Sequence, residues 1–152
     1  MDRPHGYALR KGRCDESNRV YLLTTVVTNR RPIFHDLALA RSCIQGLRYQ
    51  DEAERTTTLA FVLMPDHLHW LLELKSGTLA EVMRSMKSFT ARQINRQQGT
   101  MGEVWQHGYH DHALRSDEDI RSVARYVVAN PVRAGLVKSS WCYSHWDVVW
   151  VE

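Results

Sequence analysis

The fold is decided by residues 57–74, which read TTLAFVLMPDHLHWLLEL. Both halves of this stretch are predicted strands, because residues 57–64 are rich in β-branched and apolar side chains and residues 67–74 largely alternate. Pro65-Asp66 predicts a turn between them. Since the connection is so short, the two strands are expected to pair as an antiparallel hairpin.

Strands and helices alternate on either side of this hairpin. The expected elements are a strand at 20–28, a helix at 36–50, a helix at 78–97, a strand at 109–115, and a helix from the N-cap Ser116 to about Ala129, where Asn130-Pro131 stops it. The order predicts an α+β fold of the ferredoxin-like or RRM-like kind, an antiparallel sheet with helices packed on one face. One domain is expected over residues 1–152, with the tryptophan-rich segment 141–150 docked on its body.

Composition sets broad limits on the function. The chain has 152 residues and a net charge of +3, which permits a polyanionic partner without requiring one. No run of 18 apolar residues predicts a membrane span, and the N-terminus lacks the apolar core of a signal peptide, so a cytoplasmic protein is expected. Cys14, Cys43 and Cys142 form no CxxC pair and are expected to be plain thiols.

Two histidines share one face of the strand at 67–74. Side chains alternate across a strand, so His67 and His69 point to one side, and Leu68, Trp70, Leu72 and Leu74 point to the other. Adjacent imidazoles on the same face can chelate a divalent cation. The spacing also suits two ordinary polar residues on a solvated face, so the pattern alone is not diagnostic.

A tyrosine and an amide lie together on the last predicted helix. Its buried stripe is formed by Ile120, Val123, Ala124, Val127 and Val128. Tyr126 lies beside this stripe, and Asn130 follows four residues later on the same side. If the helix packs across the sheet face that carries His67 and His69, phenol, amide and imidazoles converge. Otherwise Tyr126 is a half-buried surface residue and Asn130 simply stops the helix.

Three segments together resemble the single-tyrosine transposases of the His-hydrophobic-His class. Residues 61–70, FVLMPDHLHW, resemble the segment with the paired histidines, and residues 125–137, RYVVANPVRAGLV, resemble the segment with the nucleophile. The intervening residues 105–115, WQHGYHDHALR, also fit. The resemblance covers about residues 17–147. It is strongest to the REP-associated tyrosine transposases.

The resemblance implies a metal-dependent transposase that cleaves and rejoins single-stranded DNA. His67 and His69 would bind Mg²⁺ or Mn²⁺, and Tyr126 would form a covalent 5′-phosphotyrosine. Asn130 stands where relatives often have a glutamine as third ligand, and His112 or a water could replace it. The expected substrate is single-stranded DNA with hairpins made by repetitive extragenic palindromes, and relatives act as monomers or homodimers.

Two groups of residues are candidates for contacting this DNA. The basic face of the helix at 78–97 could bind phosphates, or could be an ordinary solvated face; it carries Arg84, Lys87, Arg92 and Arg96. Near the proposed site, the candidates are Tyr109, His110, His112 and Arg115.

Three alternatives remain open at this level. The first is a non-catalytic DNA- or RNA-binding module on the same scaffold. The second is a metallohydrolase that activates water, with His67, His69, His110 and His112 as ligands. The third is a structural protein whose histidines only make hydrogen bonds within the fold.

Overall fold

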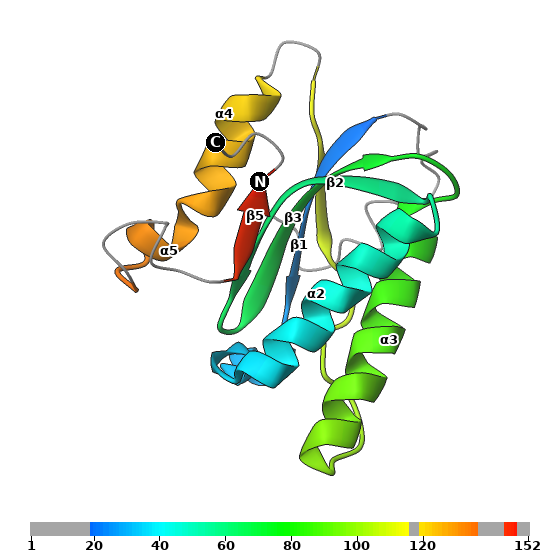
Figure 1. The fold of residues 1–152 in the computed structure, drawn as a ribbon, viewed down its shortest axis with the longest axis vertical. Helices are drawn as coiled ribbons and strands as arrows, with labels where there is room; N and C mark the ends of the chain where they lie inside the picture. The colour runs from blue at the N-terminus through cyan, green and yellow to red at the C-terminus, as the bar shows by residue number, and fades with distance from the viewer. Residues whose placement is uncertain (1–18, 116–118, 137–144, 149–152) are drawn as a thin grey trace.

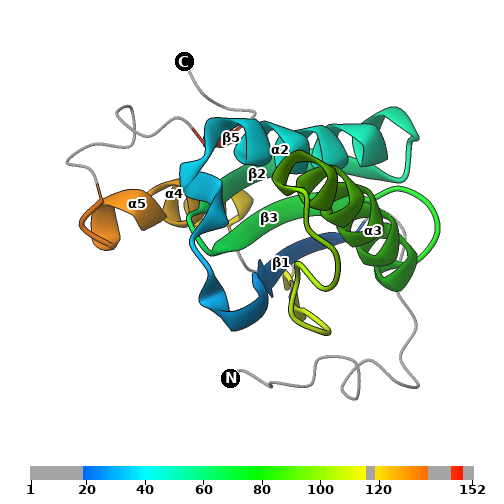
Figure 2. The same cartoon turned by 90° about the horizontal axis from the view of Figure 1, so that it is seen from below.

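A five-stranded antiparallel sheet forms the centre of the computed structural model, which describes residues 19–115, 119–136 and 145–148 (Figures 1 and 2). The strand order is β4-β1-β3-β2-β5. The strands are β1 (Val20–Val26), β2 (Thr56–Met64), β3 (His67–Leu74), β4 (His110–Ala113) and β5 (Trp146–Val148). The helices are α2 (Leu37–Glu52), α3 (Leu79–Gln98), α4 (Ile120–Val128) and α5 (Asn130–Arg133), with two 3-10 turns at Thr28–Arg30 and Ile33–His35. The predicted α+β class and antiparallel sheet are confirmed.

The hairpin at residues 57–74 forms as expected. Met64 pairs with His67 across the Pro65-Asp66 turn. A register shift between Thr58 and Ala60 places a bulge in β2 and changes which of its side chains face each way. Residues 59–64, near the turn, are all apolar, so this end of β2 is apolar on both faces and needs cover on both.

The first face of the sheet carries the larger core, beneath α2 and α3. The β3 side chains predicted for this face are all buried, and Trp70 is 0% exposed. Its indole Nε1–H donates to Thr58 Oγ1 at 2.9 Å, which satisfies the polar atom inside the core. β3 therefore presents the face pattern that the alternation predicts.

α2 and α3 pack against each other at a glycine. Asp36 caps α2, and Thr78 with Glu81 forms a capping box at the start of α3. A Cβ on Gly46 of α2 would lie only 2.6 Å from Cγ2 of Thr90 on α3, so only glycine permits this approach.

The second face of the sheet is covered by α4, so the expectation that all helices pack on one face is wrong. Figure 1 shows α4 on the opposite side of the sheet from α2 and α3. Ala124 and Val127 of α4 are buried against β2, in clusters that contain Ala60, Val62 and Met64. The two-sided apolar end of β2 is the physical reason, because those side chains would otherwise face water.

The start of α4 differs from expectation, whereas its end agrees with it. Asp119, not Ser116, is the N-cap, and its carboxylate accepts from the Arg121 N–H; residues 116–118 lie outside the described ranges. At the other end, α4 stops at Val128, just before Asn130-Pro131, as predicted. Only Ala129 separates α4 from α5, which has proline in its first turn.

The last strand is an addition to the predicted fold. β5 pairs with β2 and becomes the edge of the sheet, so part of the tryptophan-rich tail docks as a strand. The rest of residues 141–150 lies outside the described ranges. β4, at the other edge, is shorter than the predicted 109–115. No helix in the described part of the chain is long and apolar enough to cross a membrane.

Candidate active site

The two imidazoles of β3 lie side by side, and each is held through its Nδ1 atom. The ring centroids of His67 and His69 are 4.8 Å apart, with the ring planes at 87°. His67 Nδ1–H donates to Asp66 Oδ1 at 2.7 Å. Thr24 Oγ1 on β1 is hydrogen-bonded to His69 Nδ1 at 2.9 Å. With Nδ1 engaged on both rings, Nε2 is the atom through which each could bind a metal.

The surroundings keep His69 neutral and Asp66 charged. The pKa of His69 is lowered to about 4, mainly by burial and further by the charges of His67 and Arg133. Partial burial of Asp66 opposes ionisation, but its hydrogen bond to His67 and the charges of His67 and Arg30 outweigh this and lower the pKa of the carboxyl. Arg30 Nε is 3.1 Å from Asp66 Oδ2. A neutral imidazole beside a carboxylate-bound one is suited to metal ligation.

The donor set therefore fits a divalent cation bound by two imidazoles. In the part of the chain that the structure describes, no group of three or more His, Cys, Asp or Glu side chains is arranged to hold a metal ion. Among the described residues, a third protein ligand would therefore be an amide or another neutral oxygen. The four-histidine site of the metallohydrolase alternative is not formed, and neither is a three-histidine site that includes His112.

The C-terminal end of α4 lies over the end of the hairpin that carries the histidines. Val127 is 1% exposed and packs in one cluster with Val62 and Met64 of β2. These two residues are the direct cross-strand partners of His69 and His67. Directly paired residues share a face, so the last turn of α4 is on the histidine side of the sheet. Figures 1 and 2 both show α4 and α5 beside the turn between β2 and β3.

Tyr126 and Asn130 flank Val127 at this end of α4. Tyr126 is 62% exposed, so its ring is available to a large substrate. Asn130 is half-buried, and its Nδ2 donates to the carbonyl of Val127 at 3.0 Å, which leaves Oδ1 as the acceptor end of the amide. The guanidinium carbon of Arg133 lies 3.6 Å from the centroid of the Tyr126 ring.

β4 extends the sheet face that carries His67 and His69, called here the histidine face. His110 pairs with Thr24, which pairs in turn with His69, so these residues form one row across three strands. His112 pairs with Leu22 in the next row and is exposed. The structure thus brings His110 and His112 to the same face as the paired imidazoles, and places the exposed Arg115 just beyond β4.

The other DNA-binding candidates lie elsewhere. Tyr109 is 9% exposed and belongs to the core beneath α2 and α3, on the opposite side of the sheet from the histidines. Lys87 of α3 donates to the carbonyls of Gln106 and Gly108 and so holds the segment before β4. The exposed arginines of α3 are also on that side: Arg84, Arg92 and Arg96.

Three residues that contact the candidate site were not given a role by sequence reasoning. Asp66 was read only as part of a turn, although it adjoins His67. Thr24 has no local signal, because its contact depends on the pairing of β1 with β3. Arg133 lies in the quoted tyrosine segment, but its contact with Tyr126 depends on the bend between α4 and α5.

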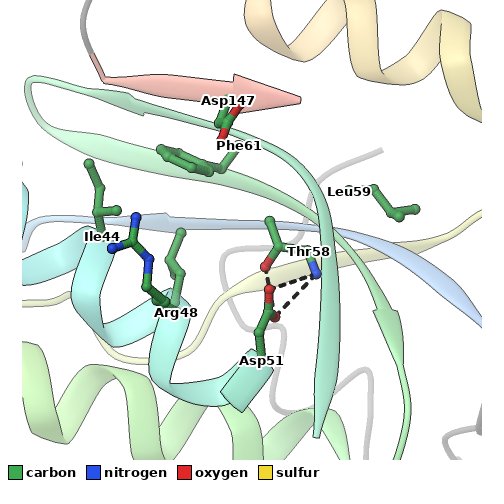
Figure 3. A pocket seen from close by; sticks show the side chains of 8 residues that line it. Ile44, Arg48, Asp51, Thr58, Leu59, Phe61 and Asp147 are labelled. Carbon is green, nitrogen blue, oxygen red and sulfur yellow. Dashed lines mark hydrogen bonds between the residues drawn. The ribbon is translucent and has the colours of Figure 1, made fainter. Parts of the chain in front are cut away.

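The structure also contains an open pocket of about 160 Å³, away from these residues (Figure 3). It lies between α2 and the β2–β5 edge, where Asp51 holds Thr58 by hydrogen bonds to its backbone N–H and hydroxyl. None of its lining residues is a candidate ligand or nucleophile. Neither the paired histidines nor Tyr126 lines this pocket.

Cys43 is buried, and burial raises the pKa of its thiol, in keeping with an unreactive structural cysteine. Cys14 and Cys142 lie outside the described ranges.

Comparison with known proteins places these features in a family. Residues 16–130 match the model of the family described as "Transposase IS200 like". A REP-associated tyrosine transposase from Escherichia coli K12 is 33% identical over 95 residues, which cover 59% of this chain and 54% of that protein. A Haemophilus influenzae protein provisionally given the same name is 31% identical over 106 residues, covering 60% of each chain. This chain thus spans a little over half the length of these relatives.

A solved structure supports the same fold. It is a REP-associated tyrosine transposase bound to a REP hairpin, and it matches with a TM-score of 0.69 and 23% identity. The match covers 88% of this chain and 79% of that one. On the family match, the sequence similarity and the shared fold together, the chain belongs to the IS200-like transposases and is similar to the REP-associated tyrosine transposases.

Proposed function

We propose that the chain cleaves and rejoins single-stranded DNA next to hairpins of the REP type, through a covalent 5′-phosphotyrosine on Tyr126. The observation that carries this proposal is the packing of α4. Val127 lies against the cross-strand partners of both histidines, and the neighbouring Tyr126 is exposed at that end of the helix. A phenol next to two imidazoles would match the needs of phosphodiester transfer, which takes a nucleophile and a metal-bound phosphate.

The reaction follows from the chemistry of Tyr126. The phenol loses its proton, and its oxygen attacks the scissile phosphorus in line. The P–O3′ bond breaks, the 3′-oxygen leaves and takes up a proton, and the 5′-phosphate stays on the tyrosine. Because one phosphodiester replaces another, a second 3′-hydroxyl can attack the phosphotyrosine and restore a DNA strand without ATP.

His67 and His69 would hold a divalent cation, Mg²⁺ or Mn²⁺, with the Asn130 amide oxygen as the candidate third ligand. When bound, such an ion neutralises a non-bridging phosphate oxygen and orients the scissile group. Asp66 and Thr24 would fix the two rings so that Nε2 faces the ion.

The DNA is proposed to lie across the histidine face. His110 and His112 share this face with His69, and Arg115 follows them at its edge. The arginines of α3 are on the other side of the sheet, so we assign them at most to flanking duplex. The solved relative is bound to a REP hairpin, which supports a hairpin as the structured part of the substrate.

The test is a covalent-adduct assay. Hairpin-bearing single-stranded oligonucleotides are incubated with the protein and Mn²⁺, and the mixture is resolved under denaturing conditions. We expect a protein–DNA band that disappears in Tyr126→Phe and in the presence of a chelator. Tyr49→Phe is the matched control, because Tyr49 is also an exposed helix tyrosine but lies on α2, across the sheet.

Each alternative gives a different result. An adduct that persists in Tyr126→Phe would reject this tyrosine as the nucleophile. DNA binding with no adduct and no cleavage would support a non-catalytic nucleic-acid-binding module. Cleavage without an adduct would point to an activated water.

A further inference from the structure

The bend after α4 returns an arginine to the ring of Tyr126. α4 ends at Val128 and α5 begins at Asn130, so Arg133 lies on a separate short helix. Its guanidinium carbon is 3.6 Å from the centroid of the Tyr126 ring, well inside the range of a cation–π contact. Arg133 Nη1 also donates to the backbone carbonyl of Tyr126 at 2.8 Å. One guanidinium is thus bound to both the backbone and the ring of the same residue.

Burial does little to hold this ring, because Tyr126 is 62% exposed. An exposed tyrosine ordinarily samples several rotamers. The carbonyl bond fixes the guanidinium at the end of α4, where a cation is favoured by unpaired carbonyls and the helix dipole. The fixed guanidinium then offers one flat surface for the ring.

We propose that Arg133 is a positioning residue for the nucleophile: it holds the Tyr126 ring in one orientation beside the histidine face before DNA arrives. The kinetic consequence rests on the proposed function, since it assumes that Tyr126 attacks phosphorus. A nucleophile that is already oriented reaches the in-line geometry more often than one that rotates freely.

The alternative is that Arg133 only caps α4. A cap would change stability but would leave the ring's motion and the chemical step unaltered. Four proteins separate the two roles: wild type, Arg133→Ala, Arg133→Lys and Arg125→Ala. Lysine keeps the charge and a donor for the carbonyl but lacks the flat guanidinium. Arg125→Ala is the matched control, because it removes an exposed cation adjacent to Tyr126 on α4 itself.

The first readout needs neither DNA nor metal. 3-Fluorotyrosine is placed at position 126, and its ¹⁹F signal is recorded in each background. We expect Arg133→Ala to shift and sharpen the signal as the ring gains mobility, Arg133→Lys to do so in part, and Arg125→Ala to leave it unchanged. An unchanged signal in Arg133→Ala would overturn the proposal.

The second readout is the single-turnover rate of adduct formation with unmodified Tyr126 and saturating oligonucleotide and Mn²⁺. We expect Arg133→Ala to slow it on the order of 10- to 100-fold, with DNA affinity changed far less. A mobile ring with an unaltered rate would also overturn the proposal. If wild type forms no adduct, the proposed function and the kinetic part of this inference both fail, while the fluorine signal still decides whether Arg133 orders the ring.

Discussion

Replacing Gly46 with alanine tests how tightly the layer beneath the sheet is packed. The new Cβ would lie 2.6 Å from Cγ2 of Thr90, closer than packed carbon atoms come, and 3.5 Å from Cδ2 of Phe89. Thr90 cannot simply rotate away. Its hydroxyl donates to the Met86 carbonyl and accepts from Trp105 Nε1–H, both at 2.9 Å, and the side chain is fully buried.

The expected magnitude follows from two opposing terms. Overpacking a core by one methyl group costs about 1–3 kcal/mol. Alanine in place of glycine inside a helix gains about 1 kcal/mol. Gly46→Ala should therefore destabilise the protein by about 1 kcal/mol, whereas the same change at an exposed site would stabilise it.

Thr90→Ser supplies the partner for a double-mutant cycle. It removes Cγ2 and keeps the hydroxyl, so alone it should cost about 1 kcal/mol for the lost methyl. In the double variant the alanine methyl occupies the vacated space, and stability should return to within about 1 kcal/mol of wild type. Urea unfolding of the four proteins gives the coupling energy, which we expect near 2 kcal/mol in favour of the double variant. The packing argument would be refuted if the two substitutions changed the free energy of unfolding additively, or if Gly46→Ala were more stable than wild type.

Two further predictions concern the candidate site, and a third concerns the helix that carries Tyr126. Thr24→Val should weaken Mn²⁺ binding about 10- to 100-fold by calorimetry, because His69 loses the partner of its Nδ1, whereas the exposed Thr57→Val should not. The folded-state pKa of His69 is lowered from 6.5 to about 4, so its contribution to stability is present above pH 6.5 and is lost as the pH falls towards 4. Metal-free wild type should thus lose about 3 kcal/mol more than His69→Gln over that range in denaturant titrations; equal losses would contradict the assignment. Asp119→Ala should raise hydrogen exchange in the first turn of α4 while Asp119→Asn, which keeps a capping oxygen, should not.

Much of the fold could be predicted because its signals are local. The two-residue alternation in 67–74 identified β3 with its observed bounds, and the apolar stripes of α2, α3 and α4 identified those helices to within a few residues at each end. β5 was missed as a strand because three residues are too few for a period. Its pairing with β2 is a long-range event that the tail's composition cannot specify.

The side of the sheet on which α4 packs was not predictable from α4 alone. Any amphipathic helix shows one apolar stripe, whichever face it covers. The relevant signal was in β2, where the unbroken apolar run at residues 59–64 left side chains for both faces. The histidines and Tyr126 were found from residue type and resemblance, but Thr24 and Arg133 depend on register and on a bend, which only coordinates supply.

The opposite orientation of neighbouring side chains in β3 has an evolutionary consequence. Even-numbered positions such as Leu68 and Trp70 fill the interior, and His67 and His69 face the opposite way. Point changes at His67 or His69 would silence the chemistry while leaving the scaffold sound, so a descendant could lose reactivity and persist as a folded protein. A single inserted codon within the strand would do the reverse, driving imidazoles inward and tryptophan into water. The fold should therefore tolerate substitution of these two histidines far more readily than any change in the length of the strand.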